Sequence, residues 1–162
     1  MSAASPAPRH DHSHCATNAR EAAERVAEQR GVRLTPTRAR VLEIVAESHR
    51  PVGAYDILQR LSEERGRAAP PTVYRALTFL VEQGFAHRID SLNAFVACFD
   101  PERNHDAGFL ICESCRSVTE LADPSLDDAI RASVTAQGFQ PSRTVVEISG
   151  ICAACAAKAS AV

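Results

Sequence analysis

Two Cys-x-x-Cys pairs are the residues of this 162-residue chain best suited to chemistry. Cys112 and Cys115 form the first pair, and Cys152 and Cys155 form the second. Four thiolates can surround a zinc ion tetrahedrally, which leaves no open position and makes the site structural. A redox Cys-x-x-Cys motif more typically occurs once, near the start of a helix in a βαβ unit. The two matched pairs therefore predict structural zinc, with a redox pair or buried thiols as alternatives.

A second set of potential metal ligands is dispersed along the middle of the chain. His87, Cys98, His105 and Glu120 offer imidazole, thiolate and carboxylate groups at separate positions. We expect these four residues to meet where two domains join. Each also has an ordinary interpretation, such as a surface histidine, a buried cysteine or a solvated carboxylate. Their spacing alone does not decide between a shared metal site and four unrelated residues.

The segment that begins at Pro70-Pro71 predicts a DNA-reading helix. Its apolar residues repeat at the spacing of one helix face: Val73, Ala76, Leu77 and Leu80. Tyr74 and Arg75 lie on the opposite face. Arg75 suits the O6 and N7 atoms of guanine, and Tyr74 suits a thymine methyl group or a phosphate. An ordinary surface pair on a core helix is the alternative interpretation.

The preceding residues predict the other helices of a helix-turn-helix. We expect a helix over 16–30, and a second helix with Thr35 as its N-cap and Pro36 at its first position. A third helix opens at Gly53 and carries apolar residues on one face. After the Pro70 helix, two strands and a turn predict a hairpin over 85–98. This order is typical of a winged helix-turn-helix, whose last helix enters the major groove.

The pattern changes beyond the hairpin. The polar segment 99–107 contains Pro101 and predicts a hinge. Beyond it we expect strands, a helix over 124–136 capped by Asp123, and a final strand. The expected strands cover 108–112, 117–121 and 143–149. The chain is therefore expected to be α+β, with a winged-helix DNA-binding domain at 16–98 and an α/β domain at 108–162.

Residues 1–15 predict a disordered tail that contains His10, His12, His14 and Cys15. We expect at most weak metal binding there, because a flexible tail does not hold its ligands in one geometry.

Composition excludes several classes of protein. Hydrophobic residues make up 45% of the chain and charged residues 23%, as in globular proteins. No apolar run is long enough to span a bilayer, and no signal-like segment is present, so we expect a cytoplasmic protein without a membrane partner. In a reducing compartment, six cysteines favour metal binding over disulfides. The absence of Trp argues against aromatic platforms for single-stranded nucleic acid.

The charge is unevenly distributed. Residues 1–90 carry a net charge of +2 and residues 91–162 a net charge of −4, which together give the overall −2. Phosphate binding needs only a local basic surface. Four arginines could supply it: Arg33, Arg38, Arg40 and Arg75.

These motifs together resemble the ferric uptake regulator family over roughly residues 18–157. The resemblance rests on residues 70–77 (Pro-Pro-Thr-Val-Tyr-Arg-Ala-Leu), 82–87 (Glu-Gln-Gly-Phe-Ala-His) and 33–38 (Arg-Leu-Thr-Pro-Thr-Arg). The two cysteine pairs follow in the order of the family. Within it, the chain is most similar to the zinc uptake regulator branch, which combines this recognition helix with a second zinc site of two His, one Cys and one Glu.

The resemblance implies a function and a set of site residues. The paired cysteines would hold a structural zinc ion, and His87, Cys98, His105 and Glu120 would hold a regulatory one, giving two Zn²⁺ per subunit. The C-terminal domain would join a homodimer. The dimer would repress zinc-uptake genes by binding a palindromic double-stranded DNA operator when zinc is bound. The residues assigned to DNA contact are Arg33, Arg38, Tyr55, Thr72, Tyr74 and Arg75.

Other readings compete with this one. Iron-sensing members carry several histidines before the first cysteine pair, whereas this chain has only His105 in that stretch. A thiolate with two imidazoles and a carboxylate also suits zinc better than iron or manganese. The alternatives are a member that senses iron or another metal, a zinc-stabilised adaptor that does not bind DNA, and a thiol oxidoreductase. Because we find no nucleophile–base pair or phosphate-binding loop, we do not expect an enzyme.

Overall fold

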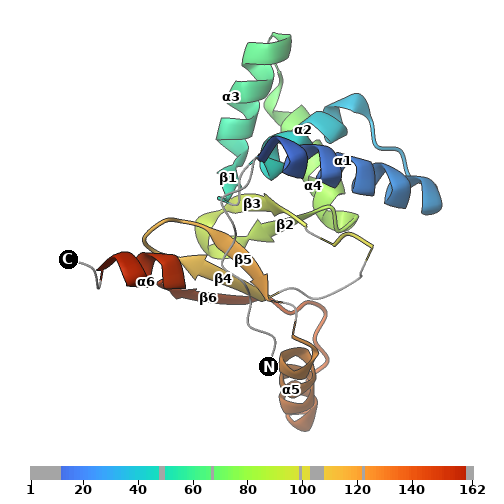
Figure 1. Cartoon of the computed structure of the whole chain (residues 1–162). Coiled ribbons are helices and arrows are strands. Elements are labelled where there is room, and N and C mark those ends of the chain that lie inside the picture. Colours follow the sequence, from blue (N-terminus) through green and yellow to red (C-terminus); the bar gives the residue numbers. More distant parts are fainter. Residues whose placement is uncertain are drawn as a thin grey trace.

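A computed structural model of the chain shows two units, each built on a three-stranded sheet (Figure 1). Among the described residues, the N-terminal unit carries four α-helices and the C-terminal unit carries two. The structure describes residues 12–47, 50–66, 68–98, 100–102, 108–121 and 123–159.

The four N-terminal helices begin and end near the predicted signals. They are α1 (His12–Gln29), α2 (Pro36–Ala46), α3 (Ala54–Arg65) and α4 (Pro70–Glu82). The predicted cap of α2 is confirmed, because the Thr35 side chain accepts a hydrogen bond from the Arg38 backbone N–H at 3.4 Å. The predicted boundary between the disordered tail and the first helix was wrong, since α1 begins at His12 rather than at residue 16. The residues before 12 lie outside the described part of the chain.

The core of the N-terminal unit lies where the apolar helix faces meet. Helix α2 packs against α1, α3 and α4, and its buried residues include Leu42 and Ile44. The predicted core face of α4 is confirmed, because Val73, Leu77 and Leu80 are all buried. The recognition helix is therefore held by its apolar side, which leaves its polar side outside the core.

A short antiparallel sheet, called the wing here, completes the N-terminal unit. It consists of β1 (Val52–Gly53), β2 (Ala86–Ile89) and β3 (Ala94–Ala97), in the order β1-β3-β2. A 3-10 turn, η1 (Asp90–Leu92), joins β2 to β3, and Asn93 closes it in the left-handed conformation with φ 46°. The sequence analysis predicted the hairpin but missed β1, because two residues carry no alternation to detect.

The C-terminal sheet has the order β5-β4-β6. Its strands are β4 (Gly108–Cys112), β5 (Val118–Leu121) and β6 (Val146–Gly150). Strands β4 and β6 run parallel, and the crossover between β5 and β6 contains α5 (Pro124–Ala136), which projects away from the N-terminal helices in Figure 1. The prediction of α5 with Asp123 as its cap is confirmed. The last strand begins at residue 146 rather than 143, and the alanine-rich end forms α6 (Ala153–Ala159).

A small apolar cluster joins the two units. Ile89 and Val96 from the wing are buried against Phe109, Ile111 and Val118 from the C-terminal sheet. The wing thus packs directly on the second unit. Within the part of the chain that the structure describes, we find no helix of the length and apolarity that a bilayer crossing requires.

Candidate metal centres and nucleic-acid interface

The four paired cysteines converge on one point of the C-terminal unit. Cys112 ends β4, and Cys115 lies in the turn that follows. Cys152 and Cys155 lie at the start of α6, directly after β6. The parallel pairing of β4 with β6 places Gly150 opposite Cys112 and so brings together cysteines that are 40 positions apart.

The spacing of the sulfur atoms fits a tetrahedral zinc ion. The four Sγ atoms all lie within 4.8 Å of one another, and Cys115 Sγ lies 3.9 Å from Cys152 Sγ. Zinc–sulfur bonds of about 2.3 Å at tetrahedral angles separate two sulfurs by roughly 3.7 Å. The cysteine cluster therefore fits a zinc ion with little rearrangement.

Backbone N–H groups stabilise the thiolate form of one cysteine in this cluster. The N–H groups of Cys115 and Cys152 point at Cys112 Sγ, at 3.5 and 3.4 Å. These donors, with that of Cys115 the strongest, lower the pKa of Cys112 to about 6. The thiolate is the form that binds metal, so Cys112 needs no strong base to become a ligand near neutral pH.

A second cluster lies between the two units. His87 comes from β2, Cys98 follows β3, and Glu120 comes from β5. One ligand atom from each lies within 4.8 Å of the others, with His87 Nε2 3.8 Å from Glu120 Oε1. His105, the fourth expected ligand, lies outside the described residues. The structure thus brings together the three predicted ligands that it describes.

The surroundings of Cys98 favour its neutral form until a cation arrives. Burial, and then the charge of Glu120, raise the pKa of Cys98 to about 12. A divalent cation would offset both effects, because it replaces the thiol proton and neutralises the carboxylate. The donor set, a thiolate with imidazole and carboxylate, fits zinc best. A cation held there would tie the wing to the C-terminal sheet.

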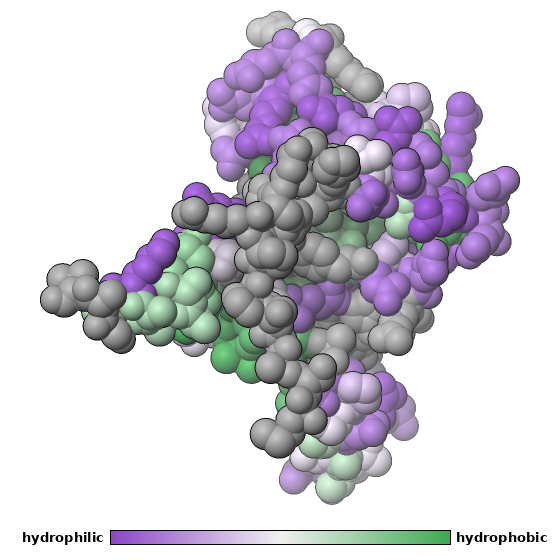
Figure 2. All heavy atoms as spheres, viewed as in Figure 1, coloured by the Kyte–Doolittle hydropathy of each residue, from purple (hydrophilic) through white to green (hydrophobic). Residues whose placement is uncertain are grey.

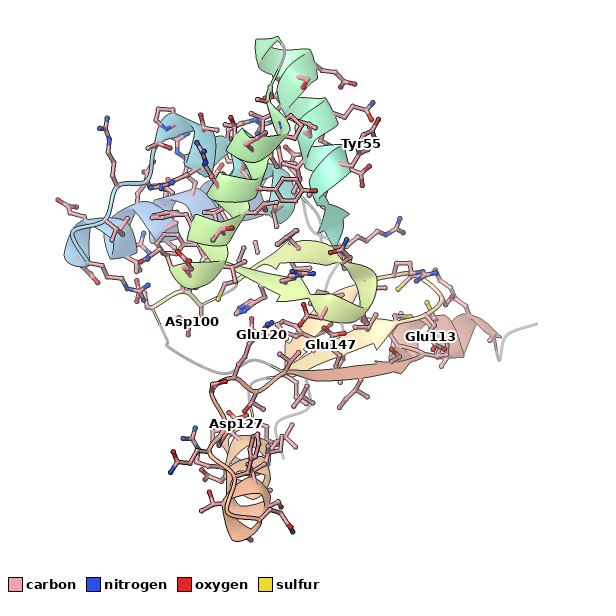
Figure 3. All side chains as sticks on the ribbon, turned by 180° about the vertical axis from the view of Figure 1, so that it is seen from behind. Tyr55, Asp100, Glu113, Glu120, Asp127 and Glu147 are labelled. Atoms are coloured by element: carbon pink, nitrogen blue, oxygen red, sulfur yellow. The ribbon has the colours of Figure 1, made fainter. Side chains whose placement is uncertain are left out.

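The sequence analysis missed two neighbours of this cluster. The Asp100 backbone N–H donates to the Cys98 sulfur, and the Phe109 ring packs against the His87 ring at 5.2 Å between centroids. Figure 3 shows Asp100 and Glu120 between the wing and the C-terminal sheet. The Phe109 contact joins segments that only the tertiary fold brings together, whereas Asp100 is two positions from Cys98 in the sequence.

The polar face of α4 is accessible, as a base-reading surface requires. Thr72, Tyr74 and Arg75 are all exposed, with Tyr74 at 59%. Tyr55, labelled in Figure 3, lies near the start of α3 and is 76% exposed. Each tyrosine offers a partner both an apolar ring and a hydroxyl group. These residues could contact one double helix through base edges and phosphates.

The arginines expected to bind DNA phosphates differ in the contacts that their side chains make within the protein. Arg33 is exposed, whereas the Arg38 guanidinium stacks on the Phe79 ring at 3.6 Å and donates to the Arg33 carbonyl at 2.6 Å. Arg40 makes ion pairs with three carboxylates: Glu43, Glu47 and Glu64. The expectation that Arg40 supplies basic surface is weakened, because its charge is already neutralised.

An apolar surface of the C-terminal unit lacks a covering layer among the described residues. Leu110 and Ile148 are register partners on β4 and β6 and are 36% and 46% exposed. Phe139, Val145 and Ile151 are also exposed. Figure 2 shows hydrophobic residues gathered over this unit, whereas the N-terminal helices are mostly hydrophilic. Such a patch is typical of a protein–protein interface.

Comparison with known proteins shows which family has this sequence and this fold. The model of the ferric uptake regulator family matches residues 29–149. The "Zinc uptake regulation protein" of Escherichia coli is 42% identical over 135 residues, which cover 82% of this chain and 78% of that protein. The structure titled "Zinc Uptake Regulator Complexed With Zinc AND DNA" is 37% identical, with a TM-score of 0.84 over 90% of this chain and 97% of that one.

Two crystal structures of XcZur are similar to this chain in sequence to nearly the same degree but differ in how well their folds superpose on it. The holo form is 45% identical and the apo form 44%, and each match covers 88% of this chain and 99% of that one. The TM-score is 0.80 for the holo form but 0.52 for the apo form. Since the identities are nearly equal, the difference lies in how the parts of the chain are arranged. By sequence and by fold, this chain belongs to the ferric uptake regulator family.

Proposed function

We propose that the protein is a zinc-responsive transcriptional repressor that binds palindromic operators of zinc-uptake genes when zinc is bound. The observation that carries this proposal is the cluster of His87, Cys98 and Glu120, which spans the two units. A cation at that point would set their relative orientation. The protein is thus a regulator of transcription and not an enzyme.

The two clusters have different roles in this proposal. The four cysteines hold a permanent zinc ion that stabilises the C-terminal unit, whose own core is small. The cluster of His87, Cys98 and Glu120, with His105 as a fourth ligand, holds the zinc ion that responds to supply. Each subunit therefore binds two Zn²⁺ ions.

The DNA-binding form is a cytoplasmic homodimer joined through the exposed apolar residues of the C-terminal unit. Each subunit places α4 in the major groove, with Thr72, Tyr74 and Arg75 toward the bases. Arg33, Arg38 and Tyr55 contact the backbone. Zinc holds the two recognition helices about one helical turn of DNA apart, near 34–36 Å, which matches adjacent half-sites of a palindrome.

The relatives support the same mechanism. The present arrangement of units matches the holo form of XcZur with a TM-score of 0.80 and the apo form with 0.52, and it matches a zinc uptake regulator in complex with zinc and DNA with 0.84. Ordering the two units before DNA arrives removes an entropic cost from DNA binding. A coupling of about 1–3 kcal/mol would change DNA affinity roughly 5–150-fold.

The test is the selection of genomic DNA fragments by the purified protein. One sample contains added zinc, and the other is treated with a mild chelator that leaves the cysteine-bound zinc in place. We expect palindromic fragments to be recovered only with zinc. No recovery with zinc, iron, manganese or nickel would overturn the proposal in favour of an adaptor that does not bind DNA.

Two serine variants test the division of roles between the clusters. Cys98→Ser should keep the fold and the dimer yet lose zinc-dependent DNA binding, because Cys98 belongs to the interdomain cluster. Cys112→Ser should lose the dimer first, because it removes a ligand of the C-terminal unit. A dimeric, zinc-responsive Cys112→Ser protein would contradict the two-site assignment.

A further inference from the structure

We propose that Glu147 is a positioning residue that fixes the orientation of the wing, and hence of the recognition helix, in the DNA-binding form. The inference rests on the proposed function and adds to it a second attachment between the units. Glu147 lies on β6, where it is the register partner of Phe109 on β4. It is not one of the candidate metal ligands.

The Glu147 carboxylate binds two consecutive backbone amides of the wing turn. Its Oε1 accepts from the Asp90 N–H at 2.6 Å, and its Oε2 accepts from the Ser91 N–H at 3.0 Å. Each oxygen therefore has its own donor, and these donors are more than 50 positions away in the sequence. Hydrogen bonds to an ionised acceptor are shorter and stronger than neutral ones.

Ion pairs reinforce this contact. Arg143, shortly before β6, donates to Asp90 Oδ2 at 3.1 Å, and Arg88 pairs with Asp90 Oδ1 at 3.1 Å. Burial alone would raise the pKa of Glu147, but the donors at Ser91 and Asp90 and the charge of Arg143 outweigh it and lower the pKa. The carboxylate is therefore in its charged, hydrogen-bonding form near neutral pH.

The Glu147 contact and the metal cluster hold the wing hairpin at different points. His87 lies on β2, whereas Asp90 and Ser91 lie in the turn η1 that follows this strand. A bond at one point alone leaves the wing able to rotate about that point. Two attachments, with Ile89 buried between them against the C-terminal sheet, remove that rotation.

The wing in turn is firmly connected to the recognition helix. The Phe85 N–H donates to the Leu80 carbonyl of α4 at 2.8 Å, and the Cys98 N–H donates to the Phe85 carbonyl at 3.0 Å. Phe85 itself is fully buried in the N-terminal core. A rotation of the wing therefore carries α4 with it. Figure 3 shows Glu147 at the face of the C-terminal sheet turned toward the wing.

The experiment compares the full-length wild-type dimer with Glu147→Ala and Glu147→Gln. The glutamine keeps the size of the side chain but puts an NH₂ donor against one of the two N–H groups. The control is Asp128→Asn, which removes one negative charge at an exposed position of α5. The DNA probe is a palindromic fragment recovered by the wild-type protein in the selection described above.

We expect both Glu147 variants to bind this fragment at least about tenfold more weakly at saturating zinc, because two charge-assisted hydrogen bonds are lost. The slope of log affinity against log salt should stay at the wild-type value, since no phosphate contact is removed. Dimerisation and cysteine-bound zinc should also match the control. These readouts separate positioning from a general loss of structure.

Hydrogen exchange supplies a readout that does not use DNA. In the zinc-loaded wild-type protein, the Asp90 and Ser91 amides should exchange slowly. In both Glu147 variants, these amides should exchange faster. Wild-type DNA affinity in the variants, or equal exchange of these amides in all proteins, would overturn the inference. If the wild-type protein recovers no DNA, the proposed function fails, while the exchange data still decide whether Glu147 holds the wing.

Discussion

At the scale of single residues, the thiols of Cys112 and Cys98, one from each candidate metal cluster, have opposite pKa shifts. Cys112 accepts backbone N–H donors that lower its pKa to about 6, whereas burial raises the pKa of Cys98 to about 12. The first thiol is largely ionised near neutral pH, and the second is protonated. A zinc ion must therefore displace a proton at Cys98 but displaces much less at Cys112.

The protonated thiol of Cys98 predicts that zinc binding at the interdomain cluster depends on pH. Because a zinc ion replaces the Cys98 proton, affinity there should fall about tenfold for each pH unit lost between about pH 8 and 7. Competition with a coloured chelator over this range measures the slope. A zinc affinity that does not change with pH would contradict Cys98 as a ligand.

Arg75 is the residue on which base recognition should depend most. Its side chain is exposed on the polar face of α4 and is suited to guanine. Arg75→Ala should weaken binding to the selected operator by about 1–3 kcal/mol, because a bidentate base contact is lost. Arg131→Ala, at an exposed position of α5, is the matched control. Operator affinity equal to that of the control would exclude α4 as the reading helix.

At the scale of elements, local signals account for where the helices begin. The side chains of Thr35 and Asp123 accept hydrogen bonds from backbone amides in the first turns of α2 and α5, and proline follows each cap. The elements that the sequence analysis missed, β1 and α6, are short. Strand β1 is two residues long and exists through its pairing with β3.

The cap of α2 predicts a stability change. Thr35→Ala should lower the free energy of unfolding of the N-terminal unit by about 1 kcal/mol, because the Arg38 N–H loses its acceptor. Thr35→Ser keeps the hydroxyl and should stay close to the wild type. Chemical denaturation of the zinc-loaded protein measures both. A serine variant as unstable as the alanine variant would show that the Thr35 methyl group matters rather than the cap.

At the scale of the whole molecule, function depends on contacts between units. The apolar cluster around Phe109, the metal cluster and the Glu147 contact all lie where the wing meets the C-terminal sheet. On the sheet itself, Leu110 and Ile148 present an exposed apolar pair. In the function proposed above, the first set of contacts orients α4, and the exposed pair joins the two subunits of the dimer.

The dimer assignment predicts the effect of a charge in the apolar patch. Ile148→Asp should dissociate the dimer at micromolar concentration, because a carboxylate buried in an interface without a partner is costly. Light scattering during gel filtration gives the mass directly. Gln59→Asp, at an exposed position of α3, should remain dimeric. An Ile148→Asp protein that is dimeric at the same concentration would move the interface elsewhere.

The sequence by itself determined the features that depend on neighbours along the chain. Helix caps, the apolar face of α4 and the strands that flank the hinge follow from spacing and turn chemistry, and the structure agrees with them. The cysteine pairs were also visible as pairs. The resemblance to a family then supplied the second ligand set, which spacing alone left undecided.

Only the tertiary structure decided what depends on distant segments meeting. It places His87, Cys98 and Glu120 within reach of one ion, and it shows Arg40 surrounded by carboxylates and Glu147 bound to the wing turn. The metal cluster, the Arg40–Glu64 ion pair and the Glu147 contact each join segments that are far apart in the sequence. Local propensity carries no information about such pairs, because their geometry arises only when β2, β4, β5 and β6 are packed together.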